Sequence, residues 1–119
     1  MSSLEAILIE ILRRLKRWRE YVPAVAKAAK DLLGPETKVY VVGGAAEDRL
    51  TVVSDVDILI ISSNVPKGGE RLHLSVKIRE VAVDRYGLPW DYPIDLHIYT
   101  PEEFEEVKSR YGKMIEIEA

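Results

Sequence analysis

Three short apolar runs, each the length of one β-strand, constrain the fold more than any other feature of the sequence. They are KVYVV at 38–42, VDILII at 56–61 and IDLHIY at 94–99. Runs this short and this rich in valine and isoleucine are typical of strands buried in a sheet. A helical pattern at 71–86, closed by Gly87, separates the last two. This alternation predicts an α/β domain in which helices flank a small mixed β-sheet.

The first third of the chain has the periodicity of an amphipathic helix. Its apolar residues recur at spacings of three and four, in the series Leu4, Leu8, Ile11, Leu15, Trp18, Val22, Val25, Ala29 and Leu32. Pro23 interrupts the stripe, so we expect two helices or a kink, with Pro23 in a first turn. The stripe can pack against the chain's own sheet or pair with another copy, and the sequence does not choose between them.

The remaining elements are short. Residues 45–50 are expected to form a helical turn. Positions 100–103 (TPEE) combine a capping threonine, a proline suited to the first helical position and a glutamate that completes a capping box. That helix is expected to end near Gly112, and 114–118 is expected to be a short edge strand.

Length and composition indicate one domain over 1–119, with N-terminal helices at 1–33 and the strand-bearing core at 38–119. The net charge of -3 argues against binding nucleic acid through bulk charge, and the absence of cysteine excludes disulfides and thiolate metal sites. The apolar runs are too short to cross a membrane, so we expect a cytoplasmic protein. A chain with no glutamine and a single asparagine resembles proteins of thermophiles.

Three acidic residues stand at unusual places beside apolar strands. Asp55 and Asp57 are two apart, which predicts side chains on the same face of a strand, and Asp95 lies near the start of another strand. Like charges beside a core repel each other unless a cation neutralises them. Mg²⁺ prefers such oxygen ligands, and three converging carboxylates can hold two Mg²⁺ ions, or Mn²⁺ in their place.

Gly43 and Gly44 follow the first strand and precede the expected helical turn, so their backbone N–H groups can approach a triphosphate closely. Ser54, just before the acids, is a further candidate for phosphate binding, although serine at such a position is more often a turn residue. Neither the dinucleotide-binding nor the Walker A glycine spacing is present.

The run VVGGAAEDRLTVVSDVDILII resembles the signature of the polymerase-beta-like nucleotidyltransferase superfamily, and the segments SDVD and IDLHIYTPEEFEE are similar to the prokaryotic minimal nucleotidyltransferases. The resemblance covers 38–106 and implies a nucleotidyltransferase fold carrying an N-terminal helical extension. It implies that Gly43 and Gly44 hold the nucleotide phosphates. It also implies that Asp55 and Asp57 bind both metal ions, and that Asp95 binds the catalytic ion and helps to activate the attacking hydroxyl.

Members of this superfamily transfer a nucleoside monophosphate from an NTP to a hydroxyl group and release pyrophosphate. The resemblance therefore implies ATP as donor and, as partner, a HEPN-family protein that accepts the nucleotide in a toxin–antitoxin-like module. The sequence departs from the usual pattern at 45–48 (AAED), where acidic side chains would repel a triphosphate unless they are paired. An alternative is therefore a catalytically weak or inactive, antitoxin-like binding subunit. Nucleotidylation of nucleic acid or antibiotics is a third, less favoured interpretation.

Two other features have simpler interpretations. His97 shares a strand face with Asp95, and a hydrogen-bonded structural histidine is favoured over a ligand there. The basic residues at 13–19 are best explained as the solvated face of a helix rather than as a surface for RNA or an acidic partner.

Overall fold

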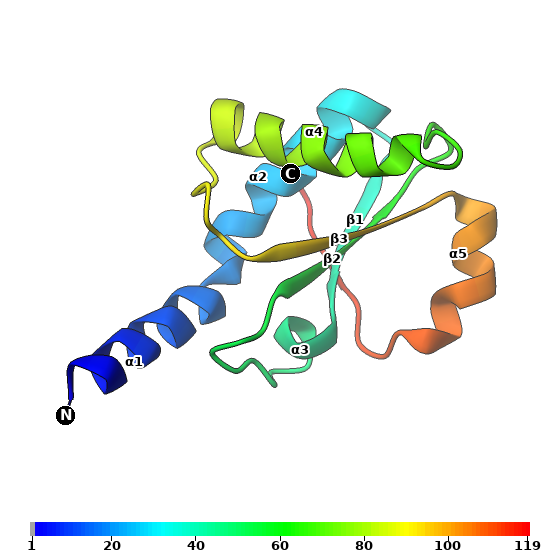
Figure 1. Cartoon of the computed structure of the whole chain (residues 1–119). Coiled ribbons are helices and arrows are strands. Elements are labelled where there is room, and N and C mark those ends of the chain that lie inside the picture. The colour runs from blue at the N-terminus through cyan, green and yellow to red at the C-terminus, as the bar shows by residue number, and fades with distance from the viewer. Residues whose placement is uncertain (1) are drawn as a thin grey trace.

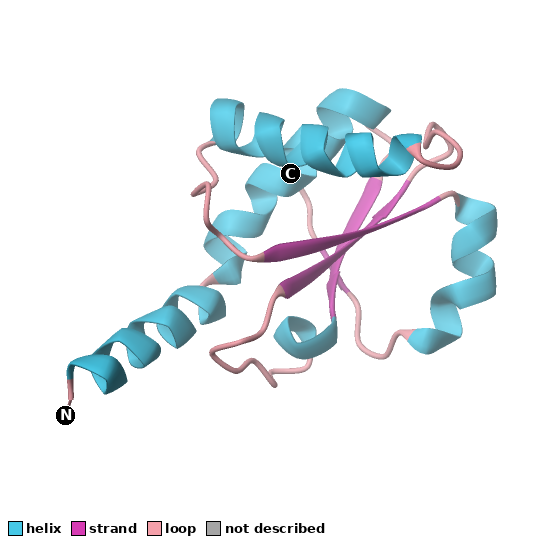
Figure 2. Cartoon of the chain, viewed as in Figure 1, coloured by secondary structure: helices cyan, strands magenta, loops and turns pink. Residues whose placement is uncertain are grey.

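The computed structural model, which describes residues 2–119, contains one mixed four-stranded sheet (Figures 1 and 2). The strands are β1 (Lys38–Val42), β2 (Val56–Ile61), β3 (Ile94–Tyr99) and β4 (Ile115–Glu116), in the spatial order β3-β2-β1-β4. β2 runs parallel to β3, whereas β1 is antiparallel to both β2 and β4. The three apolar runs thus form the three longer strands, and the mixed sheet confirms the predicted fold class.

Among the described residues 2–119, five α-helices accompany the sheet: α1 (Ser3–Lys16), α2 (Trp18–Leu33), α3 (Gly43–Ala46), α4 (Glu70–Tyr86) and α5 (Pro101–Val107). The long helices α2 and α4 pack side by side against the sheet (Figure 1). The hydrophobic core lies between these two helices and the sheet, and it is formed by alternate strand residues and the inner faces of both helices. It includes Val25, Ala29, Val41, Ile58, Ile60, Ile78 and Ala82. No helix within residues 2–119 has the length and apolar character needed to cross a membrane.

Strand alternation leaves a second set of side chains on the opposite face of the sheet. Val56, Ile58 and Ile60 of β2 belong to the core, so Asp57 and Leu59 point the other way. On β3, the residues paired with these two are Asp95 and His97. Two of the three acidic residues predicted to be functional, Asp57 and Asp95, therefore lie on the face of the sheet away from α2 and α4.

The N-terminal stripe forms two helices, but they do not meet at the proline. The break falls at Arg17 (φ -87°, ψ 26°), whose N–H group is shared between the carbonyls of Arg13 and Arg14. Pro23 lies inside α2, beyond its first turn, so the expectation that it starts a helix was wrong. The helix tolerates it at the cost of one backbone donor. Trp18 and the rest of α2 are then free to pack into the core.

Other boundaries also shifted by a few residues. α3 begins at Gly43 itself, so the glycines are the first residues of the helical turn rather than a loop before it. α5 ends at Val107 and a short 3₁₀ turn, η1 (Lys108–Arg110), follows, so the helix stops before the expected Gly112. β4 forms where the edge strand was predicted, at reduced length.

The start of α5 gives a direct test of the local structure. The Thr100 hydroxyl accepts a hydrogen bond from the Glu103 N–H group (3.2 Å), and the Glu103 carboxylate accepts one from the Thr100 N–H group (2.8 Å). We expect Thr100→Ala to lower the free energy of unfolding by about 1 kcal/mol. Thr100→Ser should lower it much less, because serine keeps the capping hydroxyl. Chemical denaturation measures both variants. Equal stability of Thr100→Ala and the wild type would contradict the capping-box assignment.

Candidate active site

Asp57 and Asp95 face the same side of the sheet from neighbouring parallel strands. The register pairs these two residues directly, so their side chains leave adjacent points of the pleat. Their side chains are 33% and 55% exposed. Two carboxylates are therefore held side by side by backbone pairing, while water and small ligands retain access.

His97 completes a cluster with the two aspartates. Its Nε2 atom lies 3.3 Å from Asp95 Oδ2 and 3.5 Å from Asp57 Oδ1. Each of the three residues offers one ligand atom, and these atoms lie within 4.8 Å of one another. The sequence favoured a structural role for His97, and the signal for this grouping was its two-residue spacing from Asp95 on one strand. The structure thus brings together two of the three predicted acids and adds an imidazole.

Asp55 and Ser54 lie in the loop that leads into β2. Asp55 precedes the first strand residue, is exposed, and is not part of the cluster; within residues 2–119 its carboxylate has no hydrogen bond or ion pair. The Ser54 hydroxyl accepts a hydrogen bond from the Thr51 N–H group (2.9 Å), and the Ser54 N–H group donates to the Thr51 carbonyl (3.0 Å). Ser54 therefore closes the turn that delivers Asp55 to the edge of the site.

Gly43 lies directly beside Asp57, because Val42 is the register partner of that aspartate. Its backbone has φ +65°, in the left-handed region, and a Cβ placed there would collide with the Asp57 carboxylate. Gly44 differs, since its φ is not positive and a Cβ would make only ordinary contact, 3.6 Å from the Arg49 carbonyl. Only the first glycine is therefore required by both backbone conformation and space.

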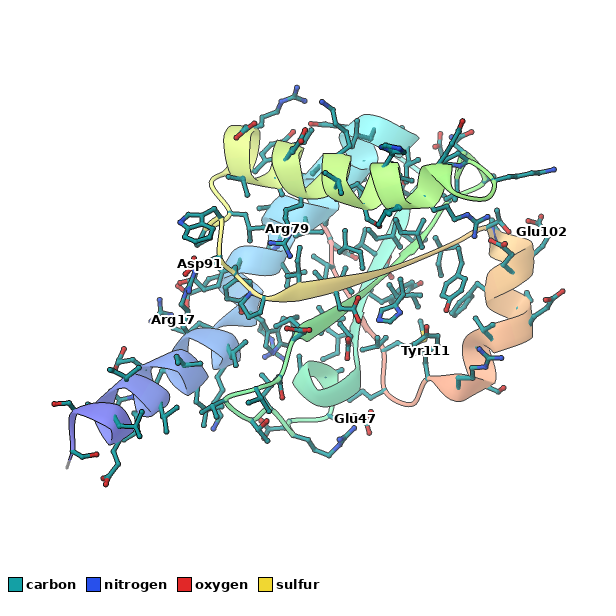
Figure 3. All side chains as sticks on the ribbon, in the orientation of Figure 1. Arg17, Glu47, Arg79, Asp91, Glu102 and Tyr111 are labelled. Carbon is teal, nitrogen blue, oxygen red and sulfur yellow. The ribbon has the colours of Figure 1, made fainter. Side chains whose placement is uncertain are left out.

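Two tyrosines form a wall beside the cluster. The hydroxyls of Tyr99 and Tyr111 are 2.9 Å apart, and the Tyr111 ring stands edge-on to His97 at 6.4 Å between centroids. Burial raises the pKa of Tyr111, and its hydrogen bond with Tyr99 raises it further. Tyr111 follows η1 and points back toward the sheet (Figure 3). The C-terminal segment thus bounds a site that the strands alone would leave open, a feature with no evident signal in the sequence.

One of the two acidic residues after the glycines is paired within the chain. Glu47, at the end of α3 (Figure 3), forms an ion pair with Arg49 at 3.3 Å. Asp48 lines a cavity of about 320 Å³ whose other charged residues are all basic, namely Lys16, Arg19 and Lys113. The sequence suggested that unpaired acids here would repel a triphosphate. In the structure, Glu47 is paired, whereas Asp48 forms no ion pair within residues 2–119.

The family of the chain follows from comparison with known proteins. A family model described as a nucleotidyltransferase domain matches residues 22–109, most of the chain and every element from α2 to α5. The chain therefore belongs to the nucleotidyltransferase domain family, within the polymerase-beta-like superfamily that its glycine and aspartate motifs resemble. Nucleotidyl transfer, in general terms, is the activity of this family.

Comparison with solved structures and with curated proteins adds no further information on function. A candidate nucleotidyltransferase from Sulfolobus solfataricus, solved as a crystal structure at 1.40 Å, is 19% identical in sequence. The alignment covers 92% of this chain and 84% of that one, with a TM-score of 0.49. A search of curated proteins returned no match.

The two glycines provide a matched pair of variants. We expect Gly43→Ala to lower the free energy of unfolding by about 1–2 kcal/mol, because alanine is strained at positive φ and its Cβ meets the Asp57 carboxylate. Gly44→Ala, one residue later, should change stability far less. Denaturant unfolding of the two variants measures the difference. Equal losses would show that Gly43 is not the constrained position.

Proposed function

We propose that the chain is an active, divalent-metal-dependent nucleotidyltransferase that moves AMP from ATP to an acceptor hydroxyl. The observation that supports this most strongly is the register pairing of Asp57 with Asp95 beside Gly43. In a member of the nucleotidyltransferase family, that arrangement sets two carboxylates next to a side-chain-free stretch of backbone. Metal ligands and a phosphate-binding surface are thereby adjacent.

The donor atoms of the cluster fit a divalent cation. Asp57 and Asp95 supply carboxylate oxygens and His97 supplies an imidazole nitrogen, all within mutual reach and all partly exposed. We propose that these three residues hold the ion, with Asp55 joining them from the loop as the resemblance implies. When bound, Mg²⁺ or Mn²⁺ would offset the carboxylate charge and stabilise negative charge on the phosphates. Two ions remain our expectation from the same resemblance.

The chain's own residues contribute mainly by positioning. Gly43 and Gly44 carry no side chains, so we propose that the phosphates approach the backbone at the start of α3, next to Asp57. The turn closed by Ser54 fixes the approach of Asp55, and we keep Ser54 as a proposed phosphate contact. Tyr111 limits the access of water from the side of the C-terminal segment.

The ion pair of Glu47 with Arg49 supports turnover over a purely binding role. An inactive, antitoxin-like subunit was the alternative because Glu47 and Asp48 would repel a triphosphate. With Glu47 paired to Arg49, the repulsion from that carboxylate is reduced. Both acids are partly solvent-exposed, so their remaining effect on a nucleotide is screened by salt.

We propose that the acceptor is a hydroxyl on a partner protein of the HEPN family, as in a toxin–antitoxin-like module. This part of the proposal rests on the resemblance of the SDVD and IDLHIYTPEEFEE segments to the minimal nucleotidyltransferases. A tyrosine, serine or threonine of that partner would receive the nucleotide.

Transfer of label from α-labelled ATP to a candidate HEPN protein, followed by mass spectrometry, tests the reaction. We expect a mass gain of one nucleotide, and a loss of at least about 100-fold in rate for Asp57→Asn and for Asp95→Asn. Asp84→Asn, an exposed carboxylate on α4, is the matched control and should retain full activity. Transfer that survives Asp57→Asn would rule out this mechanism. A wild-type chain that binds the partner without transferring label would favour the binding subunit.

His97 as a ligand has its own test in metal binding. We expect His97→Ala to weaken Mn²⁺ affinity by roughly 10-fold or more, because an imidazole donor and the orientation of both aspartates are lost together. His73, the other histidine of the chain, is exposed on α4, so His73→Ala is the control. Calorimetric titration with MnCl₂ measures both variants. Unchanged Mn²⁺ affinity in His97→Ala would indicate that His97 is a structural residue and not a metal ligand.

A further inference from the structure

Helix α1 leaves most of its apolar side chains exposed. The exposed fractions are 65% for Leu4, 57% for Ile7 and 41% for Ile11, and within α1 only Leu15, near its C-terminal end, is buried. The helix projects away from the sheet and from α2 (Figure 1). Apolar faces of this kind are normally covered in a functional protein. The apolar stripe is buried in the core along α2, but most of its continuation along α1 is exposed.

The exposed face of α1 borders a groove. A cavity of about 530 Å³ lies between α1 and the Tyr92–Pro93 turn, with Ile7 and Ile11 in its lining. Arg14, in the last turn of α1, donates two hydrogen bonds to the Asp91 carboxylate, of 2.6 and 3.1 Å. Trp90, in the same turn, is 80% exposed. A partner helix would thus meet apolar groups of both α1 and the 90–93 turn.

Two charged residues of α1 would lie opposite each other if two copies of the helix packed in antiparallel orientation. Glu5 stands in the N-terminal half and Lys16 at the C-terminal end, and within residues 2–119 neither forms an ion pair. They are eleven positions apart, which at about 100° per residue places them within about 20° of each other around the helix. Both therefore lie on one flank of the apolar stripe. Neighbouring charges are already satisfied inside the chain, as in the 2.8 Å pair of Glu10 with Arg13.

We propose that two copies of this chain associate through α1 in antiparallel orientation. In a two-fold symmetric pair of antiparallel helices, the same flank of each helix meets its counterpart. Glu5 of each copy then lies near Lys16 of the other, twice per dimer, while the apolar stripes cover each other. A parallel pair would set each charge at the level of its own counterpart and lose this match. The fourteen residues of α1 span about 21 Å, so the groove and the 90–93 turn complete the interface.

Sedimentation equilibrium on the full-length chain tests the association. We expect a mass of about twice the 13.5 kDa of one chain at concentrations of about 100 μM. The double variant Ile7→Glu/Ile11→Glu should be monomeric and, because both positions are exposed, should keep the wild-type circular dichroism spectrum. A wild-type chain that remains monomeric would overturn the proposal. This holds even if α1 is found to bind a different helical protein.

Charge reversal and cross-linking test the orientation. Glu5→Lys or Lys16→Glu alone should raise the dissociation constant roughly tenfold, since both symmetric pairs become repulsive, and the double reversal should restore it. The chain has no cysteine, so introduced cysteines report only the dimer contact. Chains with Glu5→Cys mixed with chains carrying Lys16→Cys should form a disulfide-linked dimer, whereas Glu5→Cys alone should not. Efficient linkage of Glu5→Cys to itself would indicate parallel helices and overturn the proposal.

Discussion

The parallel pairing of β2 with β3 is the constraint from which the site follows. Because Ile58 and Ile60 must face α2 and α4, the alternation of β2 forces Asp57 onto the other face of the sheet. The register then sets Asp95 opposite Asp57, and a slip of one residue would turn Asp95 toward the core. The same hydrophobic packing that stabilises the domain therefore holds two carboxylates side by side. A divalent cation, as this family typically uses, would relieve their repulsion.

The antiparallel neighbour β1 adds the second half of the arrangement. Val42 pairs with Asp57, so the chain leaves β1 at the level of the aspartate cluster. The absence of a side chain at Gly43 makes room for the Asp57 carboxylate and allows the positive φ that starts α3. Sheet register and one glycine thus bring a helical turn next to the acids. This geometry is the basis of our proposal that nucleotide and metal bind at one place.

Much of this could be predicted from the sequence, because short apolar runs, a capping box and a strand–glycine–acid pattern are local signals. The three longer strands, α4 and the start of α5 lay where their patterns placed them. What failed depended on tertiary packing. The break falls at Arg17 and Pro23 lies inside α2, although the apolar stripe runs without interruption through both positions. His97 and Tyr111 needed the register and the return of the C-terminal segment before their place beside Asp57 was visible.

The central claim is that metal and nucleotide share the face of the sheet that carries Asp57, Asp95 and His97. Anomalous diffraction from crystals grown with Mn²⁺ and a non-hydrolysable ATP analogue tests it most directly. We expect a manganese peak bounded by these three side chains, with the phosphates of the analogue against Gly43 and Gly44. A nucleotide bound elsewhere on the chain, or manganese absent from this cluster while the nucleotide is bound, would contradict it.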